Sequence, residues 1–318
     1  MATARQGREL GCLLLSGVAA WFAPLHVFVI AYVFLGPLHY LTEIAWLDKK
    51  NFYYTRAGVR PRTFLWVSVL LCVGIGIDQW FKHGWMTYFV VAAIVLALSS
   101  VVRRAWLLGI VLVGAAMAKH WSPGFAFFLG VLLPTLVHVY VFTLIFLVSG
   151  AMREKNKFGW ALPVALVGVP VVLVLAGGGG AVAADGYWTA AAGSFSALRE
   201  YLMGLLRFNV HPSSEAAVSA GAVRVLRVLG FAYLYHYLNW FLKTGLLEWH
   251  RMPAVKWGLI AAAYAGAVGI YLWNFNAGFA VLYYLSMLHV FLELPLNVVS
   301  IRGVAMGLSG RGAARAGA

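Results

Sequence analysis

Two short stretches of the sequence share one pattern that can do chemistry, Leu-His-x-x-x-Glu. LHYLTE occupies residues 38–43 and LHVFLE occupies residues 288–293, near opposite ends of a 318-residue chain. In a helix, a histidine and a glutamate four residues apart lie on the same face. An imidazole is a common metal ligand, and a carboxylate can accept the proton of its second ring nitrogen. The repeated pattern therefore predicts a site that uses histidines supported by acids.

The composition predicts the medium in which these residues work. The chain is 63% hydrophobic and 11% charged, with a mean hydropathy of +0.84. A soluble domain carries roughly 25% charged residues. Continuous apolar runs of about 18 residues or more recur, which is typical of membrane-spanning helices, whereas a barrel shows short alternating segments. We therefore expect an all-α, polytopic integral membrane helical bundle.

The apolar runs predict about nine transmembrane helices, with eight to ten compatible, in a single transmembrane domain covering 1–318. Residues 9–22 are expected either to extend the first span or to form a separate segment. A long extracytoplasmic connection is expected over 181–227, with an amphipathic interfacial helix at 194–208, and a flexible basic tail over 303–318. The expected spans are 24–46, 63–81, 86–102, 105–119, 124–149, 159–180, 228–247, 255–273 and 278–300.

The formal charge of +14 has a distribution along the chain that is typical of membrane proteins. Lysines and arginines concentrate in short loops between the expected spans, for example around Lys49, Arg103, Arg153 and Arg251. This pattern indicates positive-inside topology, with anionic lipids at the cytoplasmic face as partners, and argues against nucleic acid. It predicts a bacterial inner (plasma) membrane protein with a cytoplasmic C-terminus. The sequence does not predict whether the protein has partner subunits.

Four histidines are expected at similar depth, because all lie in odd-numbered spans that cross the membrane in the same direction. Each is about 10–16 Å from the inner face at 1.5 Å per residue. Such a layer is what a metal site in a helical bundle requires, and iron is preferred, with copper or zinc compatible. The alternative for any one histidine is a hydrogen bond to a neighbouring helix. The predicted metal ligands are His39, His138, His236 and His289.

Other polar residues in the spans are predicted to assist this layer, because ionisable groups within a membrane are costly and therefore mark function. The predicted catalytic residues are Glu43, Glu293, Asn239 and Lys243. Tyrosines that flank His236 are predicted to line a tunnel for a long unsaturated substrate, with helix packing as the alternative. They are Tyr233, Tyr235 and Tyr237.

The pattern resembles the bacterial membrane β-carotene-cleaving dioxygenases of the Brp/Blh type. GPLHYLTE at 36–43 is similar to their early Gly-Leu-Pro-His-Gly-x-x-Asp stretch, His138 to their mid-chain histidine, and LHVFLE to the pattern of their last span. Their later helix carries two histidines one turn apart; His236 fits the first, whereas position 240 is Trp. The resemblance implies an iron centre held by histidines and central cleavage of β-carotene to retinal.

Three functions are compatible with these residues. The first is a membrane oxidoreductase that uses non-haem iron and dioxygen on a lipid-soluble substrate, with carotenoid cleavage ahead of lipid hydroxylation or desaturation. The second is a proton-coupled transporter or conducting subunit in which the histidines and glutamates form a proton relay. The third is a structural subunit of a membrane complex. Metal content distinguishes the oxidoreductase from the transporter. If the protein is a structural subunit, His289→Ala should reduce stability and there is no chemical activity to lose.

Overall fold

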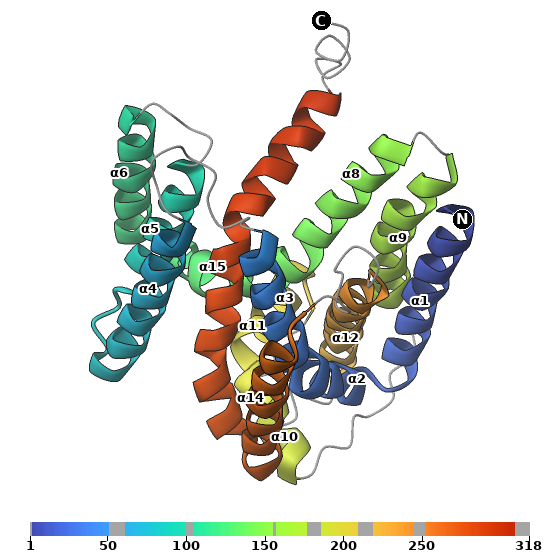
Figure 1. The fold of residues 1–318 in the computed structure, drawn as a ribbon. Coiled ribbons are helices and arrows are strands. Elements are labelled where there is room, and N and C mark those ends of the chain that lie inside the picture. The colour runs from blue at the N-terminus through green and yellow to red at the C-terminus, as the bar shows by residue number, and fades with distance from the viewer. Residues whose placement is uncertain are drawn as a thin grey trace, which may run out of the picture. The chain divides into compact units, whose positions relative to one another are not determined.

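A computed structural model describes residues 2–50, 61–99, 105–154, 157–176, 186–208, 219–243 and 252–308. These residues form helices and contain no strand, so the predicted all-α fold is confirmed (Figure 1). Among them, five helices are long and apolar enough to cross a membrane, which is compatible with a membrane protein. The expected nine spans are not confirmed. The five helices are Pro24–Lys50, Arg62–Phe81, Gly124–Arg153, Ala254–Trp273 and Phe275–Leu308.

The remaining expected spans correspond to helices that are shorter or more polar. Met86–Ser99, Trp106–His120 and Ala161–Leu175 are apolar but short. The expected span 228–247 corresponds to α12 (Ala220–Leu242), which begins eight residues earlier and includes two arginines and a histidine. The span count therefore depends on helices whose length or polarity makes them marginal membrane crossers.

The chain divides into two compact units. The first contains residues 1–39 and 150–282, and the second contains residues 40–149 and 283–318. The chain passes between them within α3 (Gly36–Lys50), within α8 (Thr143–Glu154) and within α15 (Phe275–Leu308).

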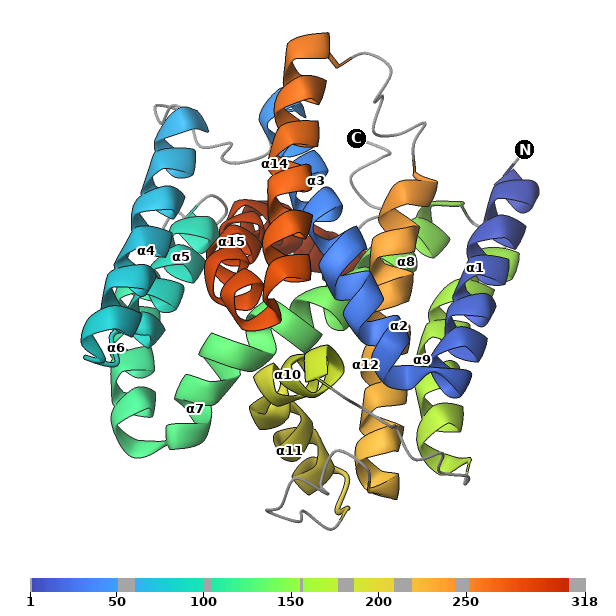
Figure 2. The same ribbon diagram turned by 90° about the horizontal axis from the view of Figure 1, so that it is seen from below.

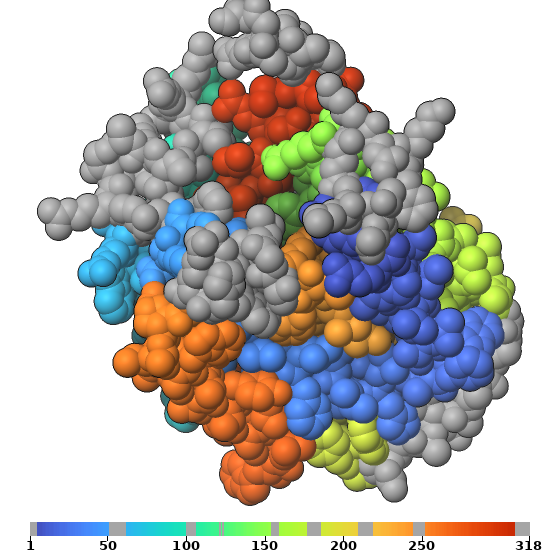
Figure 3. Space-filling view, turned by 45° about the vertical axis from the view of Figure 1, so that its right-hand side comes forward, coloured from blue at the N-terminus to red at the C-terminus, as the bar shows by residue number. Residues whose placement is uncertain are grey.

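The first unit is built around α12. Helices α1 (Ala2–Phe22), α2 (Pro24–Ile30) and α9 (Ala161–Leu175) pack against α12, as do the π-helical segment η1 (Ala31–Leu35) and α11 (Ser196–Leu205). Figure 2 and the space-filling view of Figure 3 show α1 and α2 (blue) against α12 (light orange). Further elements of this unit are η3 (Lys157–Trp160), α10 (Gly186–Ser194) and α14 (Ala254–Trp273).

The break between α1 and α2 answers a question left open by the sequence. Residues 9–22 belong to a separate helix, because α1 ends at Phe22 and α2 begins at Pro24. Ala23 adopts φ −135° and ψ 59°, outside the helical region, and proline is favoured at the first helical position. From Pro24 the helix continues without interruption through η1 and α3 to Lys50.

Aromatic rings fill the core of the first unit. Phe28 contacts Phe195 and Tyr233 at centroid distances of 4.6 and 5.0 Å, and Tyr32 contacts Phe195 at 4.9 Å. Phe195 directly precedes α11, whose residues Leu198 and Leu202 are buried. The predicted amphipathic helix at 194–208 therefore packs its apolar face against the rest of the unit.

The second unit holds a compact helical core. Its helices are α4 (Pro61–Phe81), α5 (Met86–Ser99), α6 (Ala105–Trp121), α7 (Pro123–Phe127) and the π-helical segment η2 (Phe128–Phe142), with the first part of α8 and the latter parts of α3 and α15. Its centre includes Ile75, Val90, Leu129 and Phe291. Asp78 near the end of α4 accepts a 2.7 Å hydrogen bond from the backbone N–H of Met86, which stabilises the start of α5.

Candidate metal-binding histidines

In the first unit, His39 and His236 form a pair. His39 lies in α3 directly after η1 and is 1% exposed, whereas His236 lies in α12 and is half-buried. Their Nε2 atoms are 3.1 Å apart, with ring centroids separated by 4.7 Å and ring planes inclined by 78°. This alignment arises because α12 runs beside α2 and η1, which brings His236 to the level of His39.

In the second unit, His138 and His289 form a pair of nearly the same geometry. Both are buried, and their Nε2 atoms lie 2.9 Å apart. The ring centroids are again separated by 4.7 Å, and the planes are inclined by 81°. In each pair, therefore, two nearly perpendicular imidazoles point their Nε2 atoms at a common position.

The acid behind the second pair comes from an unexpected direction. Glu293 follows His289 by four residues in α15, and the sequence suggests that it supports that histidine. Instead, Glu293 Oε2 lies 3.0 Å from Nδ1 of His138, which belongs to η2. The Nδ2 atom of Asn297 donates a 3.1 Å hydrogen bond to the same oxygen. Glu293 and Asn297 are 4% and 2% exposed, so this polar cluster is shielded from solvent.

Asn297 was missed as a site residue by the sequence reasoning. Its signal is the continuation of one helical stripe, because His289, Glu293 and Asn297 follow one another at intervals of four. A buried carboxylate needs hydrogen-bond donors, and a polar side chain on the next turn of the same helix lies close enough to donate.

One predicted metal ligand lies in a π-helical segment and another lies four residues after one. His138 lies inside η2, a π-helical segment of 15 residues that contains Pro134, and His39 follows η1, a π-helical segment of five residues. Because π-helical turns are rare and frequently occur at functional sites, both segments favour a functional role for these histidines. Pro134 lacks the N–H of an ordinary residue, and the hydroxyl of Tyr283 donates to the carbonyl of Gly130 in the same segment at 3.1 Å.

Aromatic rings pack around both pairs. The ring of His39 contacts Tyr237 and Trp240 at centroid distances of 5.2 and 5.4 Å. In the second unit, Tyr40 stacks on His289 at 5.2 Å. The residue at position 240, where the resembling family carries a second histidine, is thus a tryptophan against the imidazole of His39.

The other predicted site residues lie on α3 and in or directly after α12. Glu43 is buried on α3, Asn239 is buried on α12, and Lys243 is half-buried directly after α12. Tyr233 contacts Tyr237 on the side of α12 that faces Phe28, whereas Tyr235 stacks on Phe231. Among the three tyrosines, a direct ring contact with the histidine pair in this unit is made by Tyr237.

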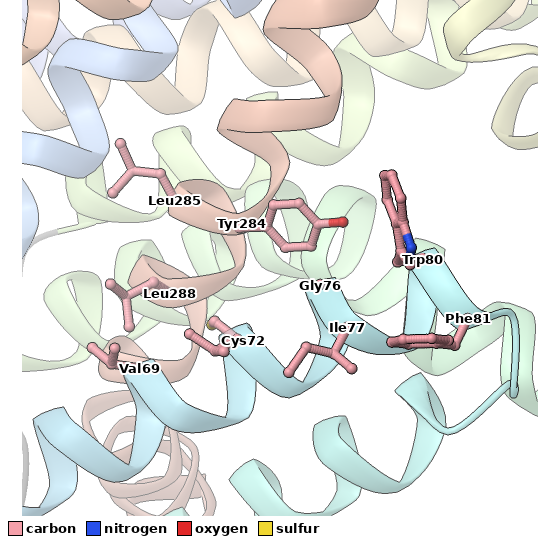
Figure 4. A pocket seen from close by; sticks show the side chains of 10 residues that line it. Val69, Cys72, Gly76, Ile77, Trp80, Phe81, Tyr284, Leu285 and Leu288 are labelled. Carbon is pink, nitrogen blue, oxygen red and sulfur yellow. The ribbon is translucent and has the colours of Figure 1, made fainter.

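An apolar groove of about 600 Å³ lies in the second unit between α4 and α15 (Figure 4). Ile77, Trp80 and Phe81 line it from α4, and Leu285 and Leu288 line it from α15. Leu288 directly precedes His289 in the chain. The lining suits a hydrocarbon chain and offers little to a polar molecule.

The chemistry of the donors is compatible with a metal ion. His39, His138 and His289 are buried histidines that could hold one. Two nitrogen ligands about 2.1 Å from a metal and at right angles to each other lie about 3.0 Å apart, close to the separation in both pairs. Without a metal, the same separation is a hydrogen bond between a protonated and an unprotonated nitrogen.

No protein-family model, curated protein or solved structure matches this chain. The resemblance to the Brp/Blh-type dioxygenases therefore stays a prediction from sequence motifs.

Proposed function

We propose that this protein is a membrane-embedded oxidoreductase whose metal ion, iron in this proposal, is held by buried histidines and whose substrate is soluble in lipid. The observation that carries the proposal is the pair of His138 and His289, whose Nε2 atoms converge at 2.9 Å while Glu293 stands behind His138. Histidines that bind metals characteristically donate their other ring N–H to a carboxylate or carbonyl.

Each residue of this cluster has a separate task in the proposal. His138 and His289 offer Nε2 atoms as ligands, and the carboxylate of Glu293, 3.0 Å from Nδ1 of His138, favours a proton on that nitrogen and so leaves its Nε2 unprotonated. Asn297 holds the carboxylate in place through its 3.1 Å hydrogen bond. A bound iron ion would supply the one-electron and dioxygen chemistry that protein side chains do not provide by themselves.

His39 and His236 are assigned the same ligand role, because their geometry repeats that of the first pair. We include Glu43, Asn239 and Lys243 as polar residues that assist the reaction, as their positions in or next to apolar helices suggest. Imidazole ligands bind copper and zinc as well as iron, so elemental analysis is needed to identify the ion.

A lipid-soluble substrate is supported by the apolar groove between α4 and α15. Carotenoid cleavage is the first reaction to assay, because it is the activity that the motif resemblance implies, and lipid hydroxylation or desaturation is the second. In this proposal the substrate arrives laterally from the bilayer, and the tyrosines of α12 assigned to its path are Tyr233, Tyr235 and Tyr237.

The deciding experiment is elemental mass spectrometry of protein purified in detergent from iron-supplied cells. We expect bound iron in the wild type and its loss in His138→Ala and His289→Ala, with helix content preserved. His26→Ala is the matched control, because His26 is half-buried and packs its ring on Trp188 at 4.4 Å. Metal-free wild-type protein, or equal metal in all variants, contradicts the proposal.

A proton relay is the second candidate, and one observation favours it. His289, His138, Glu293 and Asn297 form a continuous chain of polar contacts of 2.9 to 3.1 Å in buried surroundings. Such chains carry protons in membrane transporters. Metal-free protein that dissipates a pH gradient in sealed vesicles, with loss of this activity in Glu293→Gln, would favour the relay over the oxidoreductase.

A further inference from the structure

A buried arginine of the first unit lies outside the histidine cluster. Arg227 of α12 is 4% exposed, and its guanidinium lies 3.8 Å from the ring centroid of Trp21 in α1. Its Nε and Nη1 atoms are buried and have no hydrogen-bond partner in the described part of the chain. Because burying a charged donor without an acceptor is costly, this guanidinium is suited to binding a group that supplies acceptors.

A second arginine lies one turn earlier on α12. Arg224 is half-buried, with its guanidinium 5.4 Å from the ring centroid of Phe208. Residues three apart on a helix are neighbours, so the two cations repel each other. Each guanidinium also covers an aromatic ring with one face, which leaves its in-plane N–H groups directed elsewhere.

Carboxylates of the surrounding helices do not compensate these charges. Among the described residues of α1, α2, η1, α9 and α11, which pack on α12, the carboxylates are those of Glu9 and Glu200. Glu9 is paired with Arg5 at 3.7 Å, and it precedes Trp21 by 12 residues, about 18 Å along α1. Glu200 lies 3.9 Å from the guanidinium of Arg199. Within the described residues, the Arg224–Arg227 region therefore carries a positive charge that no carboxylate compensates.

Arg227 lies level with the break between α1 and α2. Gly230, one turn after Arg227, lies against α2, since a Cβ built on it would be 3.0 Å from the carbonyl oxygen of Pro24. Arg227 is thus at the level where α1 ends and the 27-residue helix Pro24–Lys50 begins. Phe22, at this helix end, is 80% exposed. Tryptophan side chains at the ends of apolar helices are typical of the lipid headgroup region, and Trp21 directly precedes Phe22.

We propose that Arg227 and Arg224 bind a phosphate group at the α1–α12 contact, and that the phosphate is the diester of a membrane lipid. A guanidinium donates two parallel hydrogen bonds to two oxygens of a phosphate, a geometry that an ammonium group lacks. Trp21 holds the plane of the Arg227 guanidinium, and the exposed Phe22 offers apolar surface for the acyl chains. This site is independent of the proposed metal chemistry.

Native mass spectrometry in detergent tests the proposal, with phosphatidylglycerol as the lipid probe and diacylglycerol as the phosphate-free comparison. We expect wild-type protein to retain phosphatidylglycerol selectively, and Arg227→Met to bind it at least about tenfold more weakly. Arg199→Met is the matched control. Arg199 is 6% exposed but donates from Nη1 to the carbonyl of Ala192 at 3.2 Å, so its loss should leave lipid binding unchanged.

A parallel titration with inorganic phosphate distinguishes the sources. Phosphate that binds in an Arg227-dependent manner and displaces the lipid supports the same anion site with a soluble ligand. Lipid binding that is equal in wild type and Arg227→Met overturns the proposal, as does equal retention of diacylglycerol.

Two milder variants keep the test decisive if Arg227→Met does not fold. Arg224→Met removes a half-buried side chain, and Arg227→Lys keeps the charge but loses the planar pair of donors. Both should weaken phosphatidylglycerol binding several-fold. Unchanged binding in both variants overturns the proposal.

Discussion

Nδ1 of His138 and Oε2 of Glu293 lie 3.0 Å apart, although the two residues belong to different helices. The contact joins η2 to α15 within the second unit, and it places a carboxylate on the ring nitrogen that points away from His289. A metal ligand is oriented by such a carboxylate, and its tautomer is set by the same contact.

Glu293→Gln should weaken metal binding about 10- to 100-fold, which is the usual effect of removing the acid behind a metal-binding histidine. Glutamine keeps the shape of the side chain, so helix content should be preserved. Titration of metal-free protein with Co²⁺, followed by its absorption, measures the affinity. Glu200→Gln, at an acid 3.9 Å from Arg199 on α11, is the control. Equal affinities of both variants would contradict the assignment of Glu293.

His39 and His236 should behave as one unit in a double-mutant cycle, because their Nε2 atoms are 3.1 Å apart. We expect His39→Ala and His236→Ala each to remove most of the metal affinity of this pair, with little further loss in the double variant. The coupling should amount to about 0.5–3 kcal/mol. The pair His26 and His236 is the control, since His26 packs on Trp188, and its effects should add. Additive effects of His39→Ala and His236→Ala would show that the two histidines do not act as one metal-binding unit.

The sequence predicted the helical fold well, because long apolar segments have few other solutions. The predicted first span began at residue 24, where the structure has Pro24 at the start of a helix, and the predicted span 255–273 agrees with α14 within one residue. The expected number of spans is not confirmed because α5, α6 and α9 are short for a membrane and α12 is polar.

The pairing of the site residues could not be predicted, because a helical interval fixes only which side chains share a face. The histidines were expected in one layer, but nothing in the sequence assigned His236 to His39 or His138 to His289. The interval from His289 to Glu293 did not say which histidine the acid contacts, and in the structure its Oε2 lies 3.0 Å from Nδ1 of His138. The π-helical turns also have no clear sequence signal beyond Pro134.

Tyr283→Phe should destabilise the protein by about 0.5–1.5 kcal/mol, the usual net contribution of one hydrogen bond. The Tyr283 hydroxyl donates to the carbonyl of Gly130 in the π-helical segment η2 at 3.1 Å. Reversible unfolding in mixed detergent measures the change. Tyr284→Phe is the control, because Tyr284 lines the apolar groove.

Equal stability of Tyr283→Phe and Tyr284→Phe would show that the hydrogen bond to Gly130 contributes nothing to the fold.

Gly76→Leu should block the groove between α4 and α15 while leaving the histidines intact. A Cβ built on Gly76 meets the ring of Tyr284 at 3.7 Å, an ordinary contact, so the added side chain can enter the groove without forcing the helices apart. If the groove admits a lipid-soluble substrate, turnover of β-carotene in detergent micelles should fall strongly at unchanged metal content. Gly114→Leu on α6 is the matched control, because no atom lies within 4 Å of a Cβ built there. Equal turnover of the two variants would remove the groove from the substrate's path, since both add the same apolar bulk and only Gly76 lies in the groove lining.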